Sequence, residues 1–194
     1  MNGRIPLLGL LAIQALIGYE WLMSGITKLV RGGFPSGLAD ELTEKSEGAP
    51  SWYVSILDSI VIPNASTFGV LIILGEVAVG AALVVAAGLW AFRWEELTVR
   101  GRVAVLAASV VSALGGIFMN VNFHLANGSA HPWLIPGEGF DEGVDLDSLM
   151  PGIQLALLLV AAGVWATMRG GAEASEGGVP RAEPAGRSEA EGAA

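Results

Sequence analysis

The sequence predicts an all-α membrane protein built as a four-helix transmembrane bundle. Of its 194 residues 53% are hydrophobic, and the mean hydropathy is +0.58. Four apolar stretches each approach or exceed the roughly 18–20 residues that cross a bilayer core as a helix. They occupy residues 5–26, 68–92, 103–123 and 149–168. Four spans leave no room for a separate soluble core, so residues 1–169 are predicted to form one membrane domain.

The first apolar stretch is predicted to be a retained helix and not a signal peptide. It follows a short start with a single basic residue, Arg4, as a signal peptide would. However, the run is too long, and it ends in the bulky, polar sequence GYEWLMSG where a cleavage site needs small residues.

The distribution of basic residues predicts that both termini face the cytoplasm. The link 93–102 holds three arginines, whereas the link 126–148 holds no Lys or Arg. Arg4 and Arg169 flank the outer spans on the same side as the arginine-rich link. By the positive-inside rule this gives an N-in/C-in, multi-pass protein of the cell membrane, with the two longer links outside.

The first outer link is predicted to contain a short amphipathic helix. In the sequence SWYVSILDSIVIP, apolar residues recur at helical spacing between Trp52 and Val61, and Pro63 is expected to end the helix. The segment is too short to span a bilayer. It is expected to lie at the outer membrane interface, to cap the bundle, or to do both.

Residues 170–194 are predicted to form a disordered, acidic cytoplasmic tail. The segment consists largely of Ala, Glu, Gly, Pro and Arg and has almost no large apolar side chains. Such a composition cannot bury enough surface to offset the entropy lost on ordering.

Polar side chains within the predicted spans are the strongest indication of function. Ionisable groups there cost about 2.5–3.5 kcal/mol each, so they are usually retained for a purpose. The polar residues singled out in the spans or at their ends are Glu20, Glu76, Asn120, Asn122, His124 and Gln154. Counting a rise of about 1.5 Å per residue from the span ends places all of them in the outer half of the membrane. The sequence therefore predicts a polar pocket that opens outward.

Helical spacing predicts which of these side chains share a face. Glu20, Ser24 and Thr27 lie on one face of the first span, with Lys28 at its edge reaching the outer interface. On the third span, Asn120 and His124 share a face, and Asn122 points away from it. A ridge of small residues continues below that face, which lets a neighbouring helix approach closely; its members are Ala108, Ser112 and Gly116.

This pocket has the groups that a quinone head group requires. Burial should favour the protonated form of Glu20 or Glu76, which makes either a proton donor or acceptor. His124 could bind a carbonyl and relay a proton. Two other interpretations stay open on these residues: the polar groups only hold the helices together, or they form the site of a proton-linked transporter.

Composition argues against several other cofactors. The chain has no cysteine, which excludes disulfides, iron–sulfur ligation and thiolate zinc sites, and its two histidines argue against haem. The acidic residues of 141–147 lack the spacing of an EF-hand calcium loop. They are interpreted as a solvated rim that could dock a partner, and no metal site is predicted.

Three motifs in order resemble the DoxX family of four-helix membrane proteins. They are GYEWLMSGITKLVRGGFPSGL, LGEVAVGAALVVAAGL and MNVNFHLANG. The shared positions are Ser24, Gly25, Lys28, Leu29, Phe34, Glu76, Gly80, Asn120, Asn122, Phe123, Ala126 and Gly128. The similarity covers about residues 5–168 and includes the DoxD-like branch, the small subunit of thiosulfate:quinone oxidoreductase. It implies an integral subunit of a quinone-linked redox complex, with a partner protein.

The sequence thus predicts the membrane subunit of a quinone-coupled oxidoreductase, with a non-covalently bound quinone. Catalytic roles are expected for Glu20, Glu76 and His124, and head-group binding for Ser24, Lys28, Asn120 and Asn122. Expected partners are the lipid bilayer, a redox protein docked on the acidic outer loops, and further copies of the chain; nucleic acid is not expected. The alternatives are a non-catalytic anchor or assembly subunit and a small proton-linked transporter.

Overall fold

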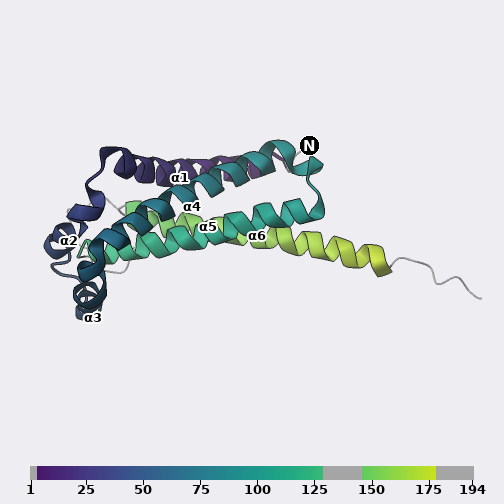
Figure 1. The fold of residues 1–194 in the computed structure, drawn as a ribbon. Helices are drawn as coiled ribbons and strands as arrows, with labels where there is room; N and C mark the ends of the chain where they lie inside the picture. The colour runs from purple at the N-terminus through teal and green to yellow at the C-terminus, as the bar shows by residue number, and fades with distance from the viewer. Residues whose placement is uncertain (1–3, 129–145, 178–194) are drawn as a thin grey trace, which may run out of the picture.

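The computed structural model describes residues 4–128 and 146–177, and the regular structure in these two ranges is entirely helical (Figure 1). The α-helices are α1 (Arg4–Arg31), α2 (Phe34–Lys45), α3 (Ser51–Ile56), α4 (Ala65–Arg93), α5 (Val99–Ala126) and α6 (Leu146–Gly177). A π-helical turn (Leu57–Val61) and a 3-10 turn (Ile62–Asn64) join α3 to α4, and a 3-10 turn (Trp94–Glu96) follows α4. Four helices are long and apolar enough to cross a membrane, which confirms the predicted all-α class with four spanning helices.

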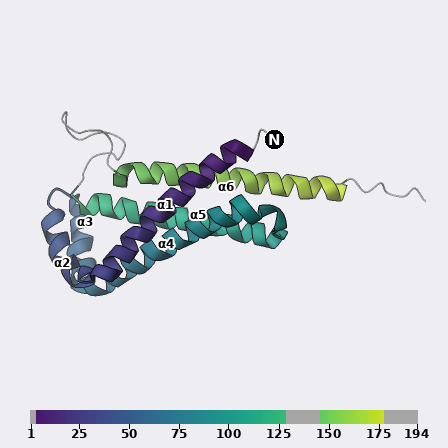
Figure 2. The same cartoon turned by 90° about the horizontal axis from the view of Figure 1, so that it is seen from above.

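The four long helices form an antiparallel bundle that is packed unequally. α1 packs closely on α4, α4 on α5, and α5 on α6, whereas α1 crosses α6 at an angle and makes few contacts with it (Figure 2). The N-terminal end of α1, the turn between α4 and α5, and the C-terminal end of α6 lie at one end of the bundle. The helices α2 and α3 lie at the other end.

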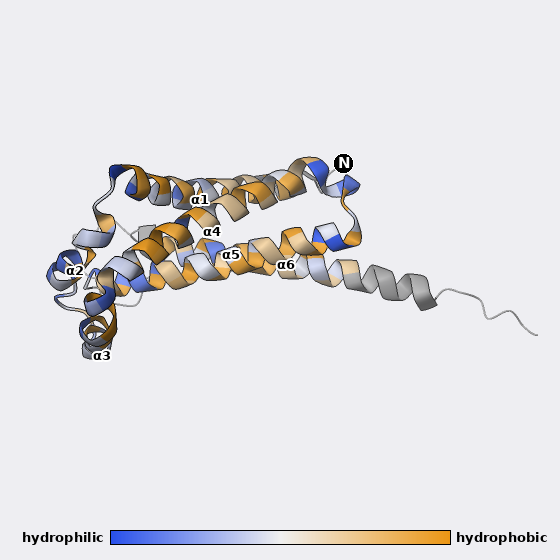
Figure 3. Cartoon of the chain, in the orientation of Figure 1, coloured by the Kyte–Doolittle hydropathy of each residue, from blue (hydrophilic) through white to orange (hydrophobic). Residues whose placement is uncertain are grey.

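The outside of the bundle is as apolar as its inside along most of its length. Figure 3 shows apolar residues over the long helices and hydrophilic residues gathered at their ends and on α2. Large apolar side chains such as Leu74, Val111 and Leu159 are exposed, whereas Leu83 and Ala113 are buried between helices. An apolar outer surface is what a lipid-facing bundle requires, because lipid tails and not water surround it.

Glycines bring α1 and α4 into backbone contact. A Cβ atom at Gly80 would lie 2.6 Å from the carbonyl oxygen of Gly18, and one at Gly25 would lie 2.9 Å from the backbone nitrogen of Val77. No larger residue fits at these positions without moving a helix. Small residues at helix crossings let membrane helices gain packing and dispersion energy in the absence of a hydrophobic effect between them. This close crossing sets the positions of the polar residues on both helices.

Helix α2 was not predicted from the sequence, and it caps the end of the bundle. Gly32 and Gly33 have φ angles of 68° and 78°, a left-handed conformation that glycine adopts at little cost and that turns the chain after α1. Leu38 and Leu42, four residues apart on α2, are both buried. Pro35 packs on Gly69 of α4.

The apolar residues of α3 and its π-helical turn divide between two faces. Tyr53 and Leu57 are buried against α2 and α4, whereas Trp52, Ile56 and Ile60 are exposed. The segment therefore packs on the bundle, as the capping alternative expected, while its placement at the membrane interface stays a prediction. The chain also stays helical through Pro63, which was expected to end the helix, because proline is tolerated in the first turn of the 3-10 helix where its missing N–H has no partner to lose.

Helix α6 extends further than expected. It runs through residues 170–177, which had been assigned to the disordered tail. Ala and Glu in this segment are good helix formers, and extending an existing helix avoids the cost of nucleation. The rest of the predicted tail, residues 178–194, lies outside the described residues, as do the acidic residues 141, 142 and 145 of the predicted docking rim.

Candidate functional site

An ion pair between α1 and α4 forms the centre of the site. Glu76 has no exposed surface, and its Oε1 accepts a hydrogen bond from Nζ of Lys28. The Lys28 ammonium also donates to Ser24 Oγ at 3.1 Å. Lys28 was expected to reach the outer interface; instead it turns into the bundle, because opposite charges attract far more strongly in apolar surroundings than in water. Glu76 thereby gains a cationic partner that the sequence analysis did not assign to it.

Two aromatic rings complete the surroundings of this ammonium group. Nζ of Lys28 lies 4.9 Å from the ring centroid of Phe34 at the start of α2, and 5.5 Å from that of Phe123 on α5. Both distances fall within the range in which a ring face attracts a cation. Lys28 is therefore held from α1, α2, α4 and α5 together, which fixes a positive charge at the meeting point of four helices.

A polar cavity of about 230 Å³ lies beside the ion pair, between α1, α4, α5 and α6. It is lined by Glu20, Trp21, Ser24, Lys28, Glu76, Asn120, Phe123 and Met150. Three buried polar atoms of this lining have no hydrogen-bond partner in the part of the chain that the structure describes: Trp21 Nε1, Glu76 Oε2 and Asn120 Nδ2. Leaving such atoms unpaired costs about 1–3 kcal/mol each, so the cavity provides two donors and an acceptor for a bound molecule.

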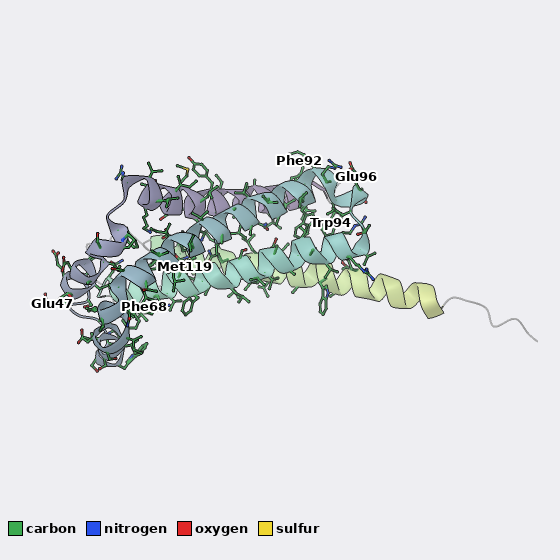
Figure 4. All side chains as sticks on the ribbon, viewed as in Figure 1. Glu47, Phe68, Phe92, Trp94, Glu96 and Met119 are labelled. Carbon is green, nitrogen blue, oxygen red and sulfur yellow. The ribbon has the colours of Figure 1, made fainter. Side chains whose placement is uncertain are left out.

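A second, apolar cavity of about 340 Å³ lies on the other side of Lys28, under α2 and α3. Its apolar lining comprises Phe34, Leu38, Leu42, Leu57, Val61, Phe68, Ile72, Phe118, Met119, Phe123 and Ala126. Figure 4 labels Phe68 and Met119 at this end of the bundle, far from Phe92 and Trp94 at the opposite end. At its rim, Glu41 accepts a hydrogen bond of 2.9 Å from Lys45, which raises the pKa of that ammonium group and keeps it charged.

The structure gathers five of the seven predicted site residues around the polar cavity: Glu20, Ser24, Lys28, Glu76 and Asn120. Proton exchange was predicted for Glu20 or Glu76 on the expectation that these carboxyl groups are buried. Glu76 is buried, whereas the side chain of Glu20 is exposed at the cavity.

The other two predicted site residues lie elsewhere. Asn122 lines the apolar cavity, where its backbone and side-chain oxygens accept the Tyr53 hydroxyl at 3.1 and 3.3 Å. His124 is buried one turn beyond Asn120 on the same face of α5, but it is not among the residues that line either cavity. The predicted sharing of a face by Asn120 and His124 is thus confirmed, whereas a common cavity for them is not.

Sequence analysis missed the aromatic and apolar part of the site. Trp21 and Phe123 form one wall, with ring centroids 6.2 Å apart, and Met150 of α6 closes another. Trp21 directly follows Glu20, and Phe34 and Phe123 lie within the sequence motifs quoted above, so a signal existed for each. Only the tertiary structure indicates that Tyr53 of α3 contacts α5.

A further polar link, deeper in the bundle, was also missed. Gln14 of α1 is buried and donates from Nε2 to the backbone oxygen of Leu83 and to Ser109 Oγ, both at 3.1 Å. This side chain connects α1, α4 and α5 and satisfies its own donor. No cavity surrounds it, so its arrangement is that of a structural contact.

Metal binding finds no support in the described part of the chain, where no group of three or more His, Cys, Asp or Glu side chains could hold an ion. Comparison of the chain with protein-family models, curated proteins and solved structures found no match in any of the three. The fold and site therefore define the class of protein by themselves: a multi-pass helical membrane protein with a charged, partly unsatisfied cavity between its helices.

Proposed function

We propose that this chain is the integral membrane subunit of a quinone-coupled oxidoreductase, and that its polar cavity binds the quinone head group. The observation that carries the proposal is the set of unpaired polar atoms around one small cavity: Trp21 Nε1, Asn120 Nδ2 and Glu76 Oε2. A quinone has carbonyl oxygens that accept from the two donors, and its reduced form has hydroxyl groups that donate to the carboxylate. Flat aromatic walls suit its ring.

The quinone would supply the redox chemistry by taking up electrons and protons. The chain itself would bind and orient it: Trp21 and Asn120 donate to its oxygens, and the Lys28 charge favours electron density on the ring. Glu76, which contacts Lys28 and the cavity at once, is the group placed to hold a proton at Oε2. A partner protein would supply the electrons, as the resemblance to DoxX proteins implies.

The resemblance to DoxX proteins supports the same role and a partner redox protein. We further propose that both termini face the cytoplasm, as the arginines of the link 93–102 favour, so that the site opens outward. In this orientation α3 lies at the outer surface, and the exposed side chains of Trp52, Ile56 and Ile60 would sit at the lipid interface.

The test is to measure quinone bound to the purified protein. The chain is extracted in mild detergent, its quinone is quantified after solvent extraction, and a tail-less benzoquinone is titrated against tryptophan fluorescence. We expect Asn120→Leu to weaken binding of the benzoquinone, and Glu76→Gln to weaken binding of its reduced form, the benzoquinol, by about tenfold or more. The first variant removes a hydrogen-bond donor and the second replaces a charged acceptor by a neutral one, each worth roughly 1–3 kcal/mol. The matched control is Glu96→Gln, which alters an exposed ion pair with Arg93 at the opposite end of the bundle.

Unchanged benzoquinone binding in Asn120→Leu together with unchanged benzoquinol binding in Glu76→Gln would contradict the proposal. Native mass spectrometry of the same preparation tests the subunit role. A stoichiometric partner carrying a redox group supports it. A partner without bound quinone would favour the anchor role, and proton-dependent uptake by the chain alone in proteoliposomes would favour a transporter.

A further inference from the structure

We infer that the apolar cavity under α2 and α3 holds the hydrocarbon tail of the same molecule whose head group occupies the polar cavity. The inference rests on the proposed function and adds the class of ligand: a neutral molecule with a flat polar head and a long apolar chain. It also assigns a role to α2 and α3, which the four-helix bundle does not need for crossing the membrane.

The two cavities meet at the same two side chains. Lys28 and Phe123 line both, so the cavities are adjacent at these side chains. The inference is that a molecule with its ring beside Trp21 and Asn120 extends its tail past Phe123 into the second cavity. Together the volumes of about 340 and 230 Å³ fall within the roughly 300–1,000 Å³ of typical small-molecule sites.

The chemistry of the two linings is complementary to the two ends of such a molecule. In the polar cavity, donors and an acceptor are left without partners. In the apolar cavity, the charged groups are paired, Lys45 with Glu41 and Lys28 with Glu76. The Tyr53 hydroxyl donates to Asn122. No unpaired charge faces this cavity from the described residues, so it suits an uncharged hydrocarbon better than the carboxylate of a fatty acid or the phosphate of a lipid.

About half of the lining of the apolar cavity comes from the cap formed by α2, α3 and the turn after α3. Leu38 and Leu42 of α2 and Leu57 after α3 line it together with Ile72 of α4. Side chains that border a cavity gain dispersion contacts when an apolar group fills it. A hydrocarbon chain would supply those contacts and remove its own apolar surface from lipid or water. The cap is thereby expected to set the preference for tail length.

The test compares a tail-less dimethoxy-methyl-benzoquinone with the same ring carrying a decyl tail, in nanodiscs containing the full chain. Ala126→Phe and Val61→Phe each fill the apolar cavity from a different element, so that a folding failure in one does not end the test. The control is Val111→Phe, which adds the same ring to an exposed position that lines neither cavity. Comparing each variant with wild type for the same ligand cancels the partitioning of the tail into lipid.

We expect both filling variants to weaken binding of the decyl compound by about tenfold or more, since burial of two methylene groups is already worth about that factor. Binding of the tail-less ring should change less than about twofold. If the tail-less ring binds and the filling variants affect both ligands equally, the inference is wrong and the proposed function stands. If neither ligand binds the wild type, both fail.

Discussion

Gly25 of α1 lies directly against Glu76 of α4: a Cβ atom at Gly25 would fall 3.0 Å from the Cβ of Glu76. The backbone of one membrane helix thus touches the only carboxylate of the bundle interior that the structure describes as fully buried. This approach allows Lys28, one turn further along α1, to reach Glu76 with its flexible stem. The close approach that Gly25 permits is therefore required for the ion pair between Lys28 and Glu76.

Gly25→Ala is expected to destabilise the protein by about 1–3 kcal/mol, the usual cost of overpacking a close contact. The added methyl group must push α1 away from α4, which also lengthens the path from Lys28 to Glu76. The measurement is the thermal midpoint of the purified protein in detergent. Gly9→Ala is the control: nothing lies within 4 Å of a Cβ there, so it should be neutral or stabilise the helix. Equal effects of the two substitutions would contradict the packing role.

Removing the Lys28 charge alone should lower the free energy of unfolding more than removing the charges of Lys28 and Glu76 together. Lys28→Met leaves the buried Glu76 carboxylate without its cation. Removing one partner of a buried ion pair typically lowers the free energy of unfolding by about 3–5 kcal/mol. In the double variant Lys28→Met/Glu76→Gln the loss should fall below the sum of the two single losses. Denaturant titration of all four proteins gives the coupling free energy.

The control cycle uses Arg93 and Glu96, an ion pair whose side chains are 63% and 60% exposed. Its coupling should stay below about 1 kcal/mol, because water screens it. Coupling at Lys28 and Glu76 no larger than in this surface pair would show that the buried pair contributes no specific stabilisation.

Gln154→Leu is expected to raise the thermal midpoint. Gln154 of α6 is fully buried, and neither polar atom of its amide has a hydrogen-bond partner in the described residues. It packs against Gly116 of α5, so a leucine of similar volume fits the same space. Relief of an unsatisfied buried amide is worth about 1–3 kcal/mol. A lower midpoint would instead indicate that the amide has a partner outside the described chain, such as a bound molecule.

The proposed orientation is testable because the chain has no native cysteine. Ser51→Cys places a thiol at the start of α3, and Val99→Cys places one at the start of α5, at the opposite end of the bundle. In intact cells a membrane-impermeant maleimide should label the first and not the second, and cell lysis should expose both. The reverse pattern would place the termini outside.

The apolar stretches and the 3.6-residue period were enough to predict four helices, since length and hydropathy decide which segments can cross a bilayer. They also predicted that Glu20, Glu76 and Asn120 would lie in the same half of the membrane, and these three residues line one cavity. Helical phase on α5 correctly separated Asn120 from Asn122. These features depend on local spacing alone, and local spacing is written directly in the sequence.

The partners of these side chains were decided by the tertiary structure. The pairing of Lys28 with Glu76 depends on how closely α1 and α4 cross, and that distance is set jointly by glycines far apart in the chain. The split of α3 into buried Tyr53 and exposed Trp52 depends on where α2 docks. The sequence by itself determined the four long helices and the spacing of the polar groups along them. Only the folded bundle determined which groups meet, because contacts between helices depend on crossing angles and separations that no single segment encodes.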